Sequence, residues 1–176
     1  MDPSDVTQII FLIVLILLSG FFSSAETALT TCNKIKMRTL ADNGNTKARR
    51  VLKITDNSGK MLSAILVGNN VVNLSASSIS TSLTIKLAGN SAAGIAAGIS
   101  TGVLTLLILI FGEISPKTLA TLYADNIALA YAGIINFLMK MLTPVIFLVN
   151  KMAMGVLFLL RVNPNKAQNT MTDRKS

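Results

Sequence analysis

The chain has 176 residues, of which 51% are hydrophobic and only 14% are charged. Soluble domains carry about 25% charged residues, so this balance indicates a membrane protein with room for one compact domain. Histidine is absent and Cys32 is the single cysteine, which excludes an intrachain disulfide and argues against a zinc or copper site. Any bound metal should therefore be a hard cation held by oxygen ligands.

The net charge of +8 is concentrated between the first two hydrophobic runs. Half of the lysines and arginines lie in one segment: Lys34, Lys36, Arg38, Lys47, Arg49, Arg50, Lys53 and Lys60. A nucleic-acid-binding segment would also be basic, but a position between two hydrophobic runs favours a cytoplasmic loop that follows the positive-inside bias. We therefore expect contacts with anionic lipid headgroups and no nucleic-acid partner.

The first hydrophobic run covers residues 6–29. Asp2 and Asp5 precede it, and no lysine or arginine does. A cleaved signal peptide is the competing interpretation, but the positive n-region is missing and the apolar stretch is long. We predict a retained membrane span whose N-terminus lies outside.

The basic segment at residues 33–57 has an amphipathic pattern, with apolar side chains such as Ile35, Leu40 and Val51. Asn43–Asn45 contains a glycine and interrupts the pattern, which predicts two short helices. We expect this helical hairpin to lie on the cytoplasmic membrane surface. Residues 56–59 then supply a turn into the next span.

The second run, residues 61–85, is long enough to cross the membrane but is rich in amides and hydroxyls. A polar stripe follows helical spacing, and Asn69 widens it. Hydrocarbon cannot satisfy such a stripe, so it must face protein or water. Hydrogen bonds between helices are one explanation; three asparagines within five residues favour a hydrophilic cavity. The stripe contains Asn70, Asn73, Ser77, Thr81 and Thr84.

The third run covers residues 92–115 and follows a short outer loop at residues 86–90. Gly94, Gly98 and Gly102 recur at intervals of four, a small-residue ridge that lets a second helix approach closely. The pattern predicts tight helix packing, with the partner helix in the same subunit or in another one.

The segment 126–160 is interrupted by Lys140, Pro144 and Lys151, which leaves pieces shorter than the roughly 20 residues a span needs. We therefore predict an all-α membrane protein with three spans and a kinked, interfacial C-terminal helix. A fourth crossing is the alternative. The membrane domain would cover residues 1–162, and residues 163–176 would form a cytosolic tail.

Glu26 and Glu113 are the two glutamates of the chain, and each lies at the end of a hydrophobic run. An ionisable residue at the lip of a span suggests a functional site. The first and third spans both run inward, so both carboxylates should reach the cytoplasmic side, below the amides of the second span. We predict an oxygen-lined pocket open to the cytoplasm. Alternatively, Glu26 is an interfacial carboxylate beside the basic loop.

The segment Phe111–Lys117 places a proline directly after the third run. Pro116 has no N–H, so the Gly112 carbonyl should lose its helical partner and lie free beside the Glu113 carboxylate. Oxygen ligands at such a helix break are typical of ion transporters. The alternative for Glu113 is an ion pair with Lys117 along a continuing helix, which Pro116 would disturb. Lys117 is otherwise an interfacial anchor.

Three stretches, Phe22–Thr30, Gly68–Asn73 and Phe111–Lys117, resemble the signature motifs of the CorC/cyclin M magnesium transporters. The resemblance covers about residues 5–160. It implies a homodimer of three spans with a juxtamembrane belt. It further implies Mg²⁺ bound within the membrane and exported in exchange for Na⁺, by alternating access, across a prokaryotic plasma (inner) membrane.

Carried over by position, the metal ligands that this resemblance implies are Ser23, an amide of the second motif (Asn70), the Gly112 carbonyl and Glu113. We add as candidate ion-pathway residues Ser24, Glu26, Asn69, Asn73, Ser77, Pro116 and Lys117.

Family members usually continue into a pair of cytosolic CBS modules that sense nucleotides. This chain stops at Ser176, so we expect it to be the membrane domain alone, with ATP acting only through the missing modules. An intramembrane enzyme would have few candidate catalytic residues, since histidine is absent and Cys32 has no candidate base. We therefore expect no enzymatic activity. The remaining alternative is a membrane scaffold or ion sensor whose polar groups only pack helices.

Overall fold

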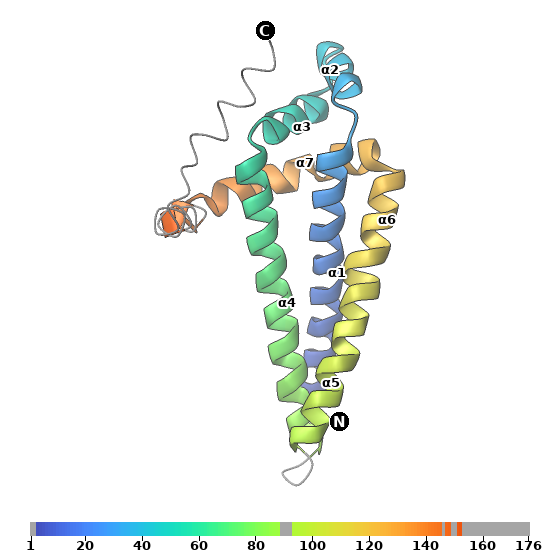
Figure 1. Ribbon diagram of the computed structural model, residues 1–176, viewed down its shortest axis with the longest axis vertical. Helices are drawn as coiled ribbons and strands as arrows, with labels where there is room; N and C mark the ends of the chain where they lie inside the picture. Colours follow the sequence, from blue (N-terminus) through green and yellow to red (C-terminus); the bar gives the residue numbers. More distant parts are fainter. Residues whose placement is uncertain (1–2, 89–92, 146, 149–150, 153–176) are drawn as a thin grey trace, which may run out of the picture. The chain divides into compact units, whose positions relative to one another are not determined.

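The computed structural model describes residues 3–88, 93–145, 147–148 and 151–152, and every element assigned in them is helical. The chain divides into two compact units, residues 1–139 and 140–176, and the fold described below belongs to the first. The helices are α1 (Pro3–Thr31), α2 (Lys34–Asp42), α3 (Thr46–Asp56), α4 (Ser58–Ala88), α5 (Ala93–Leu107), the π-helix η1 (Ile108–Ile114), α6 (Ser115–Leu122) and α7 (Ala124–Met141) (Figure 1).

Three helical stretches among the described residues are long and apolar enough to cross a membrane: Pro3–Thr31, Ser58–Lys86 and Gly94–Leu122. The predicted all-α membrane fold with three spans is therefore confirmed. The second span, α4, is longer than predicted, because Ser58 and Gly59 form its first turn. At its other end it continues through Lys86, which we had expected in a loop.

The first two spans pack against each other in opposite directions, side by side along their length (Figure 1). Asp5 of α1 pairs with Lys86 near the end of α4, whereas Ser19 bonds to Asn69 in the middle of α4. The bundle thus has an Asp5 end, where α4 finishes, and a hairpin end, where α2 and α3 follow α1.

Two glycines let the helices of the bundle approach closely. A Cβ built on Gly68 of α4 would stand 2.5 Å from the ring of Phe22 on α1. A Cβ on Gly20 of α1 would stand 3.1 Å from both the Phe111 carbonyl and the Pro116 ring. The absence of side chains at these positions is what allows α1 to lie against both other spans.

The third span contains a π-helical segment where we had predicted a break. The Ser115 N–H donates to the carbonyl of Ile110, five residues earlier, and α6 continues directly with Pro116 in its first turn. A proline in a first turn needs no N–H, so Pro116 is accommodated rather than helix-ending. The predicted helix break at Pro116 is therefore wrong.

The partner of the third span changes along its length. The first part, α5, packs on α4, whereas η1 and α6 pack on α1. The π-helical segment lies where one partner is exchanged for the other, which is a common position for such insertions near functional sites.

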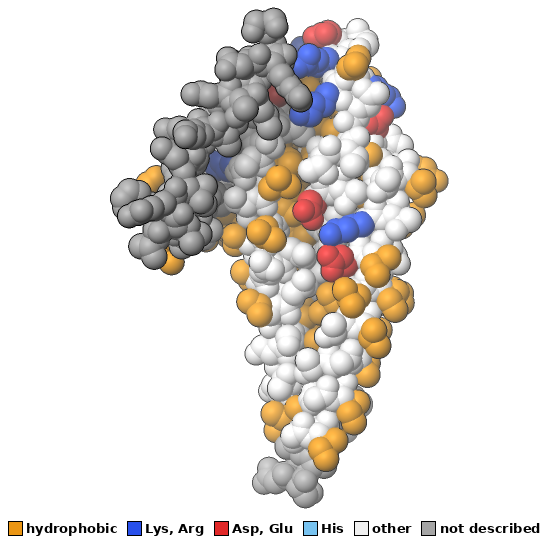
Figure 2. All heavy atoms as spheres, in the orientation of Figure 1, with side chains coloured by type: hydrophobic (Ala, Val, Ile, Leu, Met, Phe, Trp, Pro, Cys, Tyr) orange, Lys and Arg blue, Asp and Glu red, His pale blue; other side chains and the backbone are white. Residues whose placement is uncertain are grey.

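The basic segment forms the predicted helical hairpin. The Asn33 side chain caps α2 by accepting from Ile35 and Lys36, and the Asn45 side chain caps α3 in the same way. Between them Gly44 has a φ of 90°, which other residues rarely adopt. Figure 2 shows lysine and arginine side chains gathered on this part of the surface.

Helix α7 is shorter than the predicted C-terminal helix. Its buried face contains Ala128, Ala132 and Ile135, and the Tyr131 ring lies 4.6 Å from that of Phe21 on α1. It is not among the candidate spans of the described residues. The kinked part, the cytosolic tail and the alternative fourth crossing fall largely outside the described residues.

Asp125 fastens the start of α7 to α2. Its carboxylate accepts from the Lys36 ammonium and from the Asn33 backbone N–H, both at 2.9 Å. The Lys36 hydrogen bond, followed by the Asn33 bond, holds the pKa of Asp125 below its ordinary value of 3.8.

We therefore expect an acid-sensitive contribution of Asp125 to stability. Because its folded pKa is depressed, the contribution is complete above pH 3.8 and is lost as the pH falls through the folded value. Thermal unfolding of the wild type and Asp125→Asn, measured from pH 7 downward in detergent, should converge in acid. A constant difference at all pH values would contradict this expectation.

Candidate functional site

Three helices converge in the middle of the bundle at Ser19. Its hydroxyl donates to the Asn69 side-chain oxygen at 3.2 Å. A Cβ built on Gly112 of η1 would stand 2.9 Å from the same hydroxyl. The missing side chain of Gly112 thus brings the backbone of the third span close to polar groups of the first two.

Two buried oxygens near this point have no hydrogen-bond partner among the described residues: the Ser23 hydroxyl and the Asn73 side-chain oxygen. Ser23 is 1% exposed and lies one helical turn from Ser19 on the same face of α1. Asn73 lies one turn from Asn69 on the same face of α4. Because the helices are antiparallel, the two orphan oxygens flank the Ser19–Asn69 bond along the bundle axis, Ser23 towards the hairpin end.

Buried polar groups in folded proteins nearly always have partners. Unsatisfied oxygens such as those of Ser23 and Asn73 destabilise the fold by about 1–3 kcal/mol each unless something else binds to them. Their presence on the axis of a membrane bundle is the feature that most needs a ligand or an ordered water to explain it.

The two glutamates meet at one lysine. The Lys117 ammonium donates to Glu113 Oε1 at 3.1 Å and lies 3.8 Å from Glu26 Oε2. The three side chains are 39–45% exposed. Figure 2 shows this pattern on the face in view, a basic side chain between two acidic ones. The ion pair that Pro116 was expected to disturb therefore forms.

Two other candidate residues lie apart from the convergence point. The Ser24 hydroxyl is satisfied within α1, where it donates to the carbonyls of Gly20 and Phe21. Asn70 is exposed in the single chain, so the amides turned towards α1 are those of Asn69 and Asn73. The assignment of Asn70 as a ligand stays a prediction.

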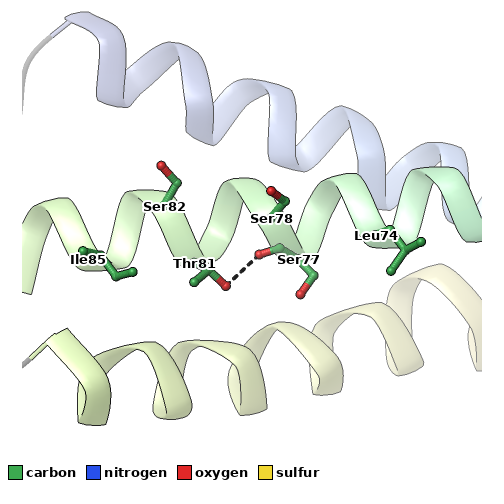
Figure 3. Close-up of a pocket in the computed structure, with 6 residues that line it drawn as sticks. All are labelled: Leu74, Ser77, Ser78, Thr81, Ser82 and Ile85. Carbon is green, nitrogen blue, oxygen red and sulfur yellow. Dashed lines mark hydrogen bonds between the residues drawn. The ribbon is translucent and has the colours of Figure 1, made fainter.

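The polar stripe of α4 continues towards the Asp5 end as an open groove. Its volume is about 580 Å³. Figure 3 shows Thr81 donating to the Ser77 carbonyl one turn away, and Thr84 bonds to Ser100 of α5. One part of the stripe thus bonds to a neighbouring helix, as the first explanation requires, whereas another part lines an open groove and the hydrophilic cavity stays a prediction. The groove is lined by Leu74, Ser77, Ser78, Thr81, Ser82 and Ile85.

The glycine ridge of α5 has no close neighbour among the residues that the structure describes. A Cβ built on Gly94, Gly98 or Gly102 would meet nothing within 4 Å. The sequence allowed a partner helix in the same subunit or in another one. Among the described residues, no helix of the same subunit packs against the ridge.

The chemistry of the convergence point is that of neutral and anionic oxygen. In the part of the chain that the structure describes, no three His, Cys, Asp or Glu side chains group together. The oxygen ligands at this point are hydroxyl, amide and backbone carbonyl groups, and the Glu113 carboxylate belongs to the residue that follows Gly112; oxygen ligands of this kind suit hard cations. The pair of carboxylates also accommodates an alkylammonium group, because that of Lys117 already lies between them.

Sequence reasoning missed Ser19. The available signal was its spacing, since a hydroxyl four residues before Ser23 inside a charge-free apolar run must face protein rather than lipid. The π-helical segment was missed as well, and nothing in the local sequence distinguishes it from a proline kink.

Comparison with known proteins identifies the family of the chain. Residues 10–175 match the family model of the cyclin M transmembrane N-terminal domain. The chain is 40% identical, over 82% of its length, to a UPF0053 protein of Haemophilus influenzae, of which it covers 33%. It is 35% identical, over 76% of its length, to the UPF0053 inner membrane protein YfjD of Escherichia coli K12, of which it covers 30%.

A further relative is the polyamine export protein of Escherichia coli K12, which is 30% identical over 83% of this chain and 35% of its own length. The chain spans about a third of the length of these relatives. The match to the family model extends over nearly all of the sequence and includes the three spans and the hairpin. The chain is thus an integral membrane protein that belongs to the cyclin M transmembrane-domain family.

Proposed function

We propose that this domain transports Mg²⁺ across the inner membrane of a prokaryote. The observation that carries the proposal is the pair of buried orphan oxygens, Ser23 Oγ and Asn73 Oδ1, on either side of the Ser19–Asn69 bond. A cation moving along the bundle axis would find an unused oxygen ligand at each of these two levels.

The residues would act as successive replacements for the hydration shell of the ion. Mg²⁺ binds water tightly and demands octahedral oxygen coordination, so several protein oxygens must be offered together. Glu113 would supply the negative charge, and Ser23 with the Gly112 carbonyl would supply neutral ligands. Exposure of the carboxylates supports entry from the hairpin end, and the basic residues of the hairpin support a cytoplasmic position for that end.

Export would follow by alternating access, with Na⁺ as the coupling ion and with the N-terminus outside. The Asp5 end of the bundle is held together by the Asp5–Lys86 pair. The opposite end carries the partly exposed Glu26 and Glu113. This asymmetry supports an inward-facing state, in which the ion enters from the cytoplasm before the outer end opens.

The domain would work as a homodimer. The hydroxyl groove of α4 and the glycine ridge of α5 are both uncovered in a single chain. Hydrocarbon cannot satisfy hydroxyl groups, so a second copy or water must cover the groove. A glycine ridge supports close contact with another helix in the membrane.

The proposal includes no enzymatic step, and any regulation by ATP would act through segments outside this chain. A scaffold or ion sensor is the competing function. Under it, the polar groups would only hold helices together, as the Thr84–Ser100 bond does.

Polyamine transport is a second candidate. The observation that favours it is the position of the Lys117 ammonium between Glu113 and Glu26, since an amine of a polyamine could take the same place. The relative named as a polyamine export protein is consistent with this candidate.

Glu113→Gln should reduce Mg²⁺ flux in proteoliposomes by about tenfold or more, because ligand charge tunes divalent affinity over decades. Flux is followed with a Mg²⁺-sensitive dye under an imposed Na⁺ gradient. Asp56→Asn, a carboxylate change on the hairpin, serves as the control and should leave flux unchanged.

Unchanged Mg²⁺ flux in Glu113→Gln would favour the scaffold or sensor. Addition of spermidine to the same vesicles separates the two transport candidates. Uptake of labelled spermidine that depends on Glu113, without Mg²⁺ flux, would assign the polyamine function instead.

A further inference from the structure

In the described part of the chain, Lys117 is the residue that pairs with both glutamates, and it does so from a third helical segment. Its ammonium lies 3.1 Å from Glu113 of η1 and 3.8 Å from Glu26 of α1. The first distance is that of a hydrogen-bonded ion pair, whereas the second is a looser electrostatic contact. Glu113 is therefore the main partner of the Lys117 ammonium, and Glu26 is a second acceptor close to it.

We propose that Lys117 is a tethered counter-cation that occupies Glu113 when the site holds no metal and moves onto Glu26 when a divalent cation binds. This inference rests on the proposed function, which makes Glu113 the charged ligand. The inference adds Lys117 as a positioning residue and Glu26 as the second carboxylate to which its ammonium moves.

The electrostatic reason is the cost of an unpaired carboxylate at the membrane level. Glu113 lies within the third candidate span, where an uncompensated charge is unfavourable. The lysine neutralises it between transport events. Once a divalent ion binds Glu113, the ammonium and the ion repel each other, and the repulsion falls when the ammonium moves away.

The geometry makes this exchange possible without moving a helix. A lysine ammonium sits on a flexible four-carbon stem and has three donors, so it can turn from one acceptor to a neighbouring one. Glu26 Oε2 is already within 3.8 Å. All three side chains are partly exposed, so packing does not confine the ammonium during the change.

The exchange also sets a threshold for ion binding at Glu113. A monovalent ion that displaces Lys117 from Glu113 replaces one unit charge by another and gains little. A divalent ion brings twice the charge to the same carboxylate and gains more, because Coulomb energy scales with the product of the charges. Displacing Lys117 costs the same for either ion, so Lys117 weakens the binding of both, and Mg²⁺ overcomes it more readily than Na⁺ or K⁺.

The test measures Mg²⁺ affinity by isothermal titration of the whole chain in detergent, in a double-mutant cycle. Lys117→Met removes the competitor, so Mg²⁺ should bind about two- to fivefold more tightly, the range of a partly exposed ion pair. Na⁺ binding at Glu113 should strengthen by a similar factor, because Na⁺ has the same competitor. Lys117→Arg keeps the charge and should remain close to the wild type, and Lys117→Gln repeats the neutral change if Lys117→Met fails to fold.

Glu26→Gln should change the Mg²⁺ affinity in the opposite direction. It removes the second acceptor of the ammonium, so Lys117 stays on Glu113 and Mg²⁺ should bind more weakly. In the Lys117→Met background the same change should have no effect, because Glu26 acts only through the lysine. An equal loss in both backgrounds would make Glu26 a direct ligand and overturn the assignment of its role.

Unchanged or weaker Mg²⁺ binding in folded Lys117→Met or Lys117→Gln would overturn the inference and leave Lys117 as a structural ion pair. That result is distinguishable from failure of the proposed function. In the latter case the wild type itself would bind no Mg²⁺, or would bind it equally well after Glu113→Gln.

Discussion

Gly68→Val should lower the free energy of unfolding by about 1–3 kcal/mol, the usual penalty for overpacking a well-packed core. A Cβ at this position would stand 2.5 Å from the buried ring of Phe22, before the two methyl groups of valine are added. Either the ring must leave its place or α1 and α4 must separate. Thermal unfolding in detergent, followed by circular dichroism, measures the loss.

Gly59→Val in the same helix is the matched control, since nothing lies within 4 Å of a Cβ there. It should change stability little. A second-site change, Phe22→Leu, should recover part of the loss in Gly68→Val because it withdraws the ring atoms that clash. If Gly68→Val and Gly59→Val unfold at the same temperature, the close contact between α1 and α4 is not formed in solution.

Lys86→Met should destabilise the Asp5 end of the bundle by about 1.5–3 kcal/mol, the typical worth of a hydrogen bond to a charged group. The Asp5 side chain is only 4% exposed and is paired with Lys86, which also donates to Ser4 at 3.1 Å. Removal of the ammonium takes away the cation that Lys86 supplies to the buried Asp5 carboxylate, which is more harmful than removal of both partners.

The double variant Asp5→Asn with Lys86→Met provides the control. It should regain much of the stability, because no buried charge remains. Lys60→Met, at the other end of α4 and without an ion pair among the described residues, should behave like the wild type. If the double variant were less stable than Lys86→Met alone, the pairing of Asp5 with Lys86 would not explain the effect.

The larger features of the fold could be predicted because they depend on local chemistry. Apolar runs of sufficient length predict the spans, and they are present. The hairpin could be predicted from the two asparagines that cap its helices and the glycine between them. These residues act locally, because each asparagine side chain accepts from N–H groups two and three residues later and Gly44 adopts a positive φ; neither effect needs a tertiary contact.

The details of the site could not be predicted because they depend on how helices rotate against each other. Sequence spacing places Asn69 and Asn70 next to each other, but only tertiary packing determines that Asn69 meets Ser19 while Asn70 is exposed. Likewise Pro116 is compatible with a kink or with the first turn of a new helix. Contact with Gly20 accompanies the second outcome.

The π-helical segment η1 has a consequence for the angular phase of the third span. A π-turn holds one more residue than an α-turn, and one residue corresponds to about 100° around a helix of 3.6 residues per turn. The face that α6 presents to α1 is therefore offset from the face that α5 presents to α4. Had the α-helix been uninterrupted, Lys117 would point away from Glu26 whenever α5 kept its contact with α4. The number of residues between the α5–α4 contact and the α6–α1 contact thus determines whether Lys117 faces Glu26.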